Sequence, residues 1–67
     1  MPVIDVTLGA GRSLPQLREL IEALTEATER AIGAERPSIR VVLREVPRTH
    51  FAAGGVTLSE RDGVELD

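Results

Sequence analysis

The sequence has 67 residues, a formal net charge of -3 and a hydrophobic fraction of 42%. A single domain of this length buries only about 60% of the surface that its unfolded chain exposes, so its stability is marginal. It has no cysteine and a single histidine, so neither disulfides nor a metal site of its own can add stability. Oligomerisation is the remaining common source of stability.

The charge pattern argues against nucleic acid and membranes as partners. Acidic residues outnumber basic ones by 11 to 8, and no basic cluster is interleaved with aromatic side chains. No apolar run approaches the roughly 20 residues that span a bilayer, and no signal-peptide pattern is present. We therefore expect a soluble, cytoplasmic protein.

The first predicted element is a strand over residues 3–8, where apolar side chains alternate with others at the period of a half-buried strand. Pro2 precedes it, and a small second residue generally permits removal of Met1. Removal would leave Pro2 as a free secondary amine. All eight basic residues are arginines, which stay protonated, so an amine base must be the N-terminus. The alternative is a strand-starting proline that needs no ladder donor.

A helix is predicted to follow, beginning at Ser13 and ending before Gly33. Ser13 and Gln16 have the capping-box spacing, and a glycine after the last periodic residue is typical of a helix C-terminus. Apolar residues recur at three- and four-residue steps and predict one core-facing side. That side comprises Leu14, Leu17, Leu20, Ile21, Leu24, Ala27, Ala31 and Ile32.

The run from Ser38 to Val46 predicts a second strand. Strand, helix and strand with short joints form a βαβ unit, whose strands should be parallel with a right-handed crossover. Two strands do not make a stable sheet by themselves, so the face opposite the helix is predicted to meet another subunit. That face carries Arg40, Val42 and Arg44.

Residues 50–58 contain Gly54 and Gly55 and predict a short hairpin or an extended arm. Residues 59–67 are polar and acidic, and we assign no structure to them. The predicted fold class is therefore α+β, with one βαβ unit and a short C-terminal β-hairpin in residues 1–58. An acidic tail, residues 59–67, follows that domain.

The candidate functional residues are Pro2, Arg12, Arg40 and Phe51, with Arg44, Arg48 and His50 as weaker candidates. Arg12 lies at the joint between strand and helix. Arg40 lies within the apolar run of the second strand, where an arginine either points to solvent or has an anionic partner, because an unpaired buried charge is costly. Neighbouring subunits could bring both arginines against another chain's N-terminus.

These residues resemble the 4-oxalocrotonate tautomerase family of the tautomerase superfamily. The resemblance covers roughly residues 2–58 without a gap. Its landmarks are Pro2, Gly11-Arg12-Ser13, Ser38-Ile39-Arg40-Val41, and His50-Phe51 followed by Gly54-Gly55.

The resemblance implies that Pro2, once Met1 is removed, acts as general base and acid. It implies that Arg12 and Arg40 bind substrate carboxylate and stabilise the developing enolate, and that Phe51 shapes an apolar pocket. It also implies a hexamer, assembled as a trimer of dimers with active sites shared between subunits, and no cofactor or metal. The predicted reaction is enol–keto tautomerisation of an unsaturated or aryl 2-keto acid, a small carboxylate substrate.

The sequence departs from the family pattern at two places. Gly9 and Ala10 stand where many members have a bulky apolar residue and a glutamate, and Ala52-Ala53 replaces a Gly-Ile pair. Both changes remove volume near the expected pocket, so a larger or altered substrate fits the pattern.

Two alternative functions remain open. One is a non-catalytic oligomeric module or a partner subunit in a hetero-oligomer. The other is a related hydratase or dehalogenase, which the lack of an acidic residue beside Phe51 disfavours.

Overall fold

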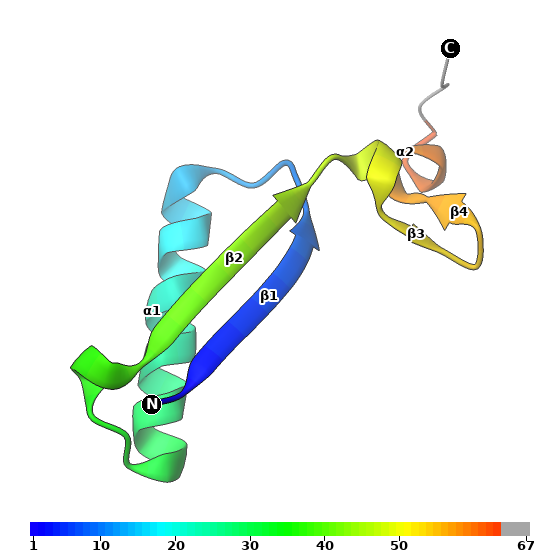
Figure 1. The fold of residues 1–67 in the computed structure, drawn as a ribbon. Helices are drawn as coiled ribbons and strands as arrows, with labels where there is room; N and C mark the ends of the chain where they lie inside the picture. Colours follow the sequence, from blue (N-terminus) through cyan, green and yellow to red (C-terminus); the bar gives the residue numbers. More distant parts are fainter. Residues whose placement is uncertain (64–67) are drawn as a thin grey trace.

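The computed structural model describes residues 1–63 and contains a βαβ unit followed by a short hairpin (Figure 1). The βαβ unit is formed by β1 (Val3–Gly9), α1 (Leu14–Ile32), the 3-10 helix η1 (Arg36–Ser38) and β2 (Arg40–Val46). The C-terminal part contains η2 (Arg48–His50), β3 (Ala52–Ala53), β4 (Val56–Thr57) and α2 (Leu58–Arg61). This element order confirms the predicted fold class.

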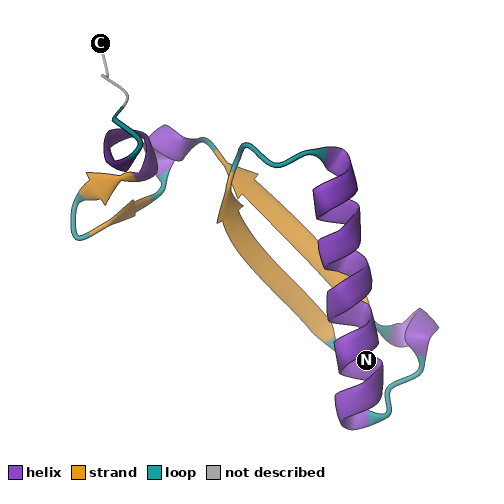
Figure 2. Ribbon diagram, turned by 180° about the vertical axis from the view of Figure 1, so that it is seen from behind, coloured by secondary structure: helices purple, strands orange, loops and turns teal. Residues whose placement is uncertain are grey.

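The strands of the βαβ unit pair in parallel, with a register that runs from Val3 opposite Arg40 to Gly9 opposite Val46. Helix α1 lies against one face of this sheet, as the view from behind shows (Figure 2). Along β1 the side chains alternate between exposed and half-buried, as predicted. The hairpin strands β3 and β4 form a separate antiparallel pair.

Helix α1 begins and ends where the local sequence predicts. The Ser13 side chain accepts a hydrogen bond from the Gln16 backbone N–H, and the Gln16 side chain accepts one from the Ser13 N–H, which completes the capping box. At the other end, Gly33 has a φ of 69° and its N–H donates to the Glu29 carbonyl oxygen. A left-handed residue at this position closes the helix at little cost only when it is glycine.

The core-facing side of α1 differs in part from the prediction. Leu17, Leu20, Ile21 and Leu24 are half-buried as expected, but Leu14, Ala27, Ala31 and Ile32 are exposed. Thr25 is buried and Thr28 half-buried, and their hydroxyls donate to the carbonyls of Ile21 and Leu24, each at 2.8 Å. Because those internal bonds satisfy the hydroxyls, Thr25 and Thr28 can lie on the buried side of α1, where the prediction had placed Ala27 and Ala31 instead.

Strand β2 begins two residues later than predicted, because Ser38 belongs to η1 and Ile39 follows it. The backbone N–H of Ile39 donates to the Arg36 carbonyl oxygen at 3.1 Å, and the Ser38 hydroxyl donates to the Glu35 carbonyl oxygen at 2.7 Å. These local bonds turn the chain from α1 into the sheet.

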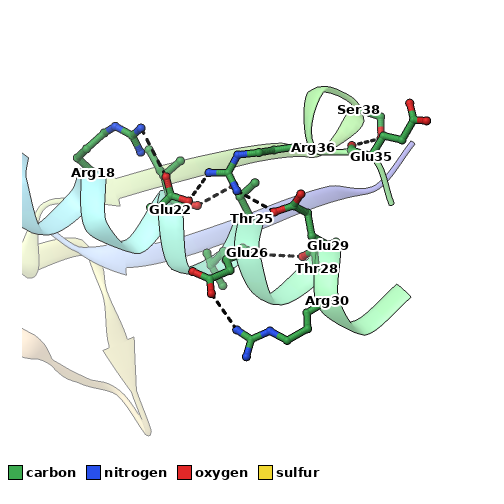
Figure 3. A network of polar contacts seen from close by, with 12 residues as sticks. Arg18, Glu22, Thr25, Glu26, Thr28, Glu29, Arg30, Glu35, Arg36 and Ser38 are labelled. Atoms are coloured by element: carbon green, nitrogen blue, oxygen red, sulfur yellow. Dashed lines mark hydrogen bonds and ion pairs between the residues drawn. The ribbon is translucent and has the colours of Figure 1, made fainter. Parts of the chain in front are cut away.

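Arg36 fastens this turn to the helix (Figure 3). Its guanidinium donates to Glu29 at 2.8 Å and forms a second ion pair with Glu22, about two helical turns earlier in α1. The hydrogen bond from Arg36 lowers the pKa of the Glu22 carboxyl below its ordinary value. Arg18 adds a third, longer contact to Glu22 at 3.9 Å.

A single chain of this protein has very little core. Among residues 1–63, Ile39 is the only hydrophobic residue that is buried, with 9% of its surface exposed. The radius of gyration is 15.2 Å, against about 11 Å for a compact domain of this length. The hairpin and α2 extend from one end of the βαβ unit and account for the elongated outline (Figure 1).

The sheet face opposite α1 is open to solvent in the single chain. It exposes Val3 and Val42, and across it Arg44 forms a forked ion pair with Asp5, at 2.9 and 3.2 Å. The predicted alternation of arginine and valine on this face is confirmed.

No helix within residues 1–63 combines the length and apolar character required to cross a lipid bilayer. Cytoplasmic location stays a prediction of the sequence.

Replacing Arg36 with glutamine tests the ion pairs that fasten η1 to α1. A carboxyl with a lowered pKa in the folded state adds stability above its ordinary pKa, and that stability disappears as pH falls through the lowered value. We expect Arg36→Gln to lower the thermal midpoint at neutral pH by a few degrees. The difference from the native protein should shrink between about pH 5 and about pH 2.

Arg30→Gln is the control, because it removes another exposed arginine, one that pairs with a single carboxylate, Glu26. It should lower the midpoint less than Arg36→Gln. A loss in Arg36→Gln that does not change with pH would contradict the electrostatic explanation.

Candidate functional site

The amino end of the sheet places Pro2 beside Arg40. The backbone N–H of Arg40 donates to the Pro2 carbonyl oxygen at 3.0 Å, which extends the parallel ladder one residue before β1. This bond uses only the carbonyl of Pro2, so the missing proline N–H costs nothing here. Met1 is 82% exposed, so the peptide bond that joins it to Pro2 lies at the surface.

The guanidinium of Arg40 is available for an anion. Its Nη1 donates to the Ser38 carbonyl oxygen at a long 3.3 Å, and it forms no ion pair with a carboxylate of residues 1–63. The residue is exposed, so its charge is hydrated in the single chain. This outcome matches the solvent-facing alternative of the sequence analysis.

Arg12 lies at the opposite end of the sheet, between β1 and α1. Its Nη1 donates to the Gly9 carbonyl oxygen at 3.0 Å. The turn before it needs Gly11, whose φ of 132° is one that residues with side chains rarely adopt. An open hollow of about 470 Å³ lies here, lined by Ala10, Gly11, Arg12, Gln16 and Arg48.

Arg48, a weaker candidate in the sequence analysis, shares this hollow with Arg12. Its Nε and Nη2 donate to the two carboxylate oxygens of Asp62, at 2.7 and 3.2 Å. The hydrogen bond lowers the pKa of the Asp62 carboxyl. The closeness of Arg12 and Arg48 could have been inferred from the topology. Arg12 follows β1 and Arg48 follows β2, and the carboxyl ends of parallel strands share one edge.

Phe51 lies on the same side of the molecule as Arg12, at the start of the hairpin. It is half-buried, and its carbonyl oxygen accepts a hydrogen bond from the Leu58 N–H at 2.9 Å. The side chain does not line the hollow that contains Arg12.

The four predicted site residues thus fall into two groups within one chain. Pro2 and Arg40 lie at the amino end of the sheet, whereas Arg12 and Phe51 lie beyond its carboxyl end. Strand β1 has seven residues between them, a length of roughly 20 Å. A site that uses all four residues therefore needs more than one chain.

The family model described as "Tautomerase enzyme" matches residues 2–61, nearly the whole chain. The chain belongs to the tautomerase family. Tautomerases are isomerases, so this protein is an isomerase by class, and the resemblance noted in the sequence is confirmed.

Individual relatives agree with this assignment to the tautomerases. A Staphylococcus epidermidis protein named a probable tautomerase is 43% identical over 61 residues, which cover 91% of this chain and 100% of the relative. A crystal structure described as "apo unFused 4-OT" is 44% identical with a TM-score of 0.81, covering 85% of this chain and 98% of that one.

A further solved structure is described as a heterohexamer 4-oxalocrotonate tautomerase from Chloroflexus aurantiacus. It is 35% identical with a TM-score of 0.85, and the match covers 90% of this chain and 97% of that one. The comparisons therefore place the protein with the 4-oxalocrotonate tautomerases.

The space that Gly9 leaves by lacking a side chain does not open into the hollow. Gly9 is buried, and a Cβ atom there would lie 2.5 Å from Leu58 Cδ1 and 3.2 Å from Arg48 Nη1. The volume that a side chain at this position would fill is already taken by these two side chains. Gly9 thus allows α2 to pack against the end of β1.

A double-mutant cycle tests this packing. Gly9→Ala places a methyl group against Leu58, so it should lower the free energy of unfolding by about 1–3 kcal/mol, the usual cost of overpacking. Leu58→Ala removes the obstructing atom, and in that background the same Gly9 change should cost at least about 0.5 kcal/mol less. The four proteins are compared by denaturant unfolding at one protein concentration. Additive losses would show that the two positions do not pack together.

Proposed function

We propose that this protein is a cofactor-independent tautomerase that interconverts the enol and keto forms of an unsaturated 2-hydroxy or 2-keto acid. Pro2, after removal of Met1, is the general base and acid. Arg12 and Arg40 bind carboxylate and stabilise the enolate, and Phe51 supplies apolar surface. The observation that carries the proposal is the backbone hydrogen bond that holds Pro2 beside Arg40, whose guanidinium has no carboxylate partner within residues 1–63.

The chemistry follows from these groups. Neighbouring arginine cations and exclusion of water both favour the neutral amine over the ammonium, so Pro2 could act as a base near neutral pH. The amine takes the proton of the 2-hydroxyl group and returns a proton to a carbon further along the conjugated chain. Negative charge that develops on the oxygen is met by guanidinium donors already in place.

We further propose that each site is built from neighbouring subunits. The separation of Pro2 from Arg12 along β1 supports this, because one chain cannot close the site on its own. The open sheet face and the small core support an oligomer, for which we propose a hexamer arranged as a trimer of dimers. Apolar groups such as Val3 and Val42 would then be covered by neighbouring chains.

A second candidate function is that of a partner subunit in a hetero-oligomer. It is supported by the similar heterohexamer from Chloroflexus aurantiacus, at 35% identity. In that case the chain contributes arginines to sites whose base comes from a different chain.

The intact mass of the natively expressed protein separates the two functions at the first step. The catalytic proposal requires a mass without Met1, because an acylated Pro2 nitrogen is not a base. A mass that retains Met1 would reject Pro2 as the base and favour the partner-subunit function.

Turnover of 2-hydroxymuconate and of enol phenylpyruvate, followed by ultraviolet absorbance, tests the assigned residues. Pro2→Ala should lower kcat/KM on the order of 100-fold, the usual scale for a positioned acid–base group. Arg40→Gln should lower it by about 100-fold or more, because an oxyanion donor is lost. Arg30→Gln is the control, since it removes an exposed arginine of α1 and should keep native turnover. Native turnover in Pro2→Ala and Arg40→Gln, with the oligomer intact, would reject the mechanism.

A further inference from the structure

Two guanidinium groups from distant parts of the sequence meet at the hollow beyond the carboxyl end of the sheet. We propose that Arg48 is a second carboxylate-binding residue of this hollow, acting with Arg12, and that Asp62 holds it in position. The inference rests on the proposed function and deepens it, because it adds a specificity-determining residue to the same substrate site.

The hydrogen bonds of the two arginines converge on neighbouring backbone groups. Arg12 Nη1 donates to the Gly9 carbonyl oxygen at 3.0 Å, and Arg48 Nη1 lies 3.5 Å from the Ala10 carbonyl oxygen. The second of these contacts is long and weak. The Nη1 group of Arg48 thus lies at the end of β1 and can exchange a poor acceptor for a charged one.

Asp62 binds the other two nitrogens of the Arg48 guanidinium. It accepts from Nε and Nη2 at 2.7 and 3.2 Å and leaves Nη1 as the nitrogen that faces β1. A bidentate pair of this kind fixes the plane of the guanidinium as well as its position. Asp62 therefore acts as a positioning residue, because its carboxylate hydrogen-bonds to no side chain of residues 1–63 other than Arg48.

The charges around the hollow favour an anion. Its lining contains two arginines and no acidic residue, and Gln16 is occupied by the capping box of α1. Counting Asp62 behind Arg48, the charges of Arg12, Arg48 and Asp62 leave one net positive charge at the hollow. A carboxylate is the matching group, since planar guanidinium forks bind it in bidentate fashion.

A purely structural role is the competing explanation for Arg48, because its ion pair also ties α2 to the segment after β2. Two substitutions break that same ion pair and differ in what they leave in the hollow. Arg48→Gln removes the cation, whereas Asp62→Asn keeps it and removes only the counter-charge. If Arg48 only ties α2 down, the two variants should behave alike.

Isothermal titration calorimetry with cis,cis-muconate measures binding without turnover. Muconate is a dicarboxylate that lacks the 2-hydroxyl group on which the proposed reaction acts. We expect Arg48→Gln to weaken muconate binding by about 10-fold, the scale of one charge-assisted hydrogen bond. Asp62→Asn should weaken muconate binding less than Arg48→Gln does, because the cation stays in the hollow and only its positioning partner is weakened. Arg48→Lys should also fall between Arg48→Gln and the native protein, since it keeps the charge without the fork.

Equal weakening in Arg48→Gln and Asp62→Asn would overturn the proposal, as would native affinity in Arg48→Gln. Absence of muconate binding to the native protein would overturn it too. Thermal unfolding of each variant, recorded in the same buffer, confirms that the folded protein is being titrated. Because calorimetry does not depend on Pro2, this result and the turnover of the Pro2 and Arg40 variants can fail independently.

Discussion

The main physical constraint on this chain is that it buries very little apolar surface. A two-stranded parallel sheet with one helix on one face leaves its other face in solvent, and only Ile39 is buried among the hydrophobic residues of the described chain, 1–63. Polar contacts therefore carry much of the local order, as in the Arg36 ion pairs that fasten η1 to α1. Exposed ion pairs contribute little individually, so the proposed oligomer would supply stability that the single chain lacks.

The same topology divides the functional residues. In a parallel pair, the amino ends of both strands lie together and so do the carboxyl ends, so Pro2 meets Arg40 and Arg12 meets Arg48. Gly9 links the second group to the C-terminal segment, because its missing side chain admits Leu58. Packing of α2 and the position of Arg48 are thus consequences of one glycine at the end of β1.

Local signals in the sequence were sufficient for β1, α1, β2 and the hairpin, whereas α2 (Leu58–Arg61) lies largely in the segment to which no structure was assigned. The Ser13–Gln16 spacing and Gly33 located both ends of α1, because helix caps depend on neighbouring residues only. Thr25 escaped prediction, since its burial depends on a hydroxyl bond inside the helix that makes a polar residue acceptable against the sheet. The role of Gly9 escaped it as well, because the atoms that fill its space belong to Leu58 and Arg48, far along the chain.

The parallel ladder has a consequence for how mixed assemblies would behave. Because one chain holds its proline and its Arg12 at opposite ends, a composite site would draw these two groups from different chains. A chain altered at Pro2 would still lend an intact Arg12 to its neighbour, and a chain altered at Arg12 would still lend an intact Pro2. Two inactive variants mixed in one oligomer would then rebuild some whole sites, so defects at the two ends of β1 would complement each other.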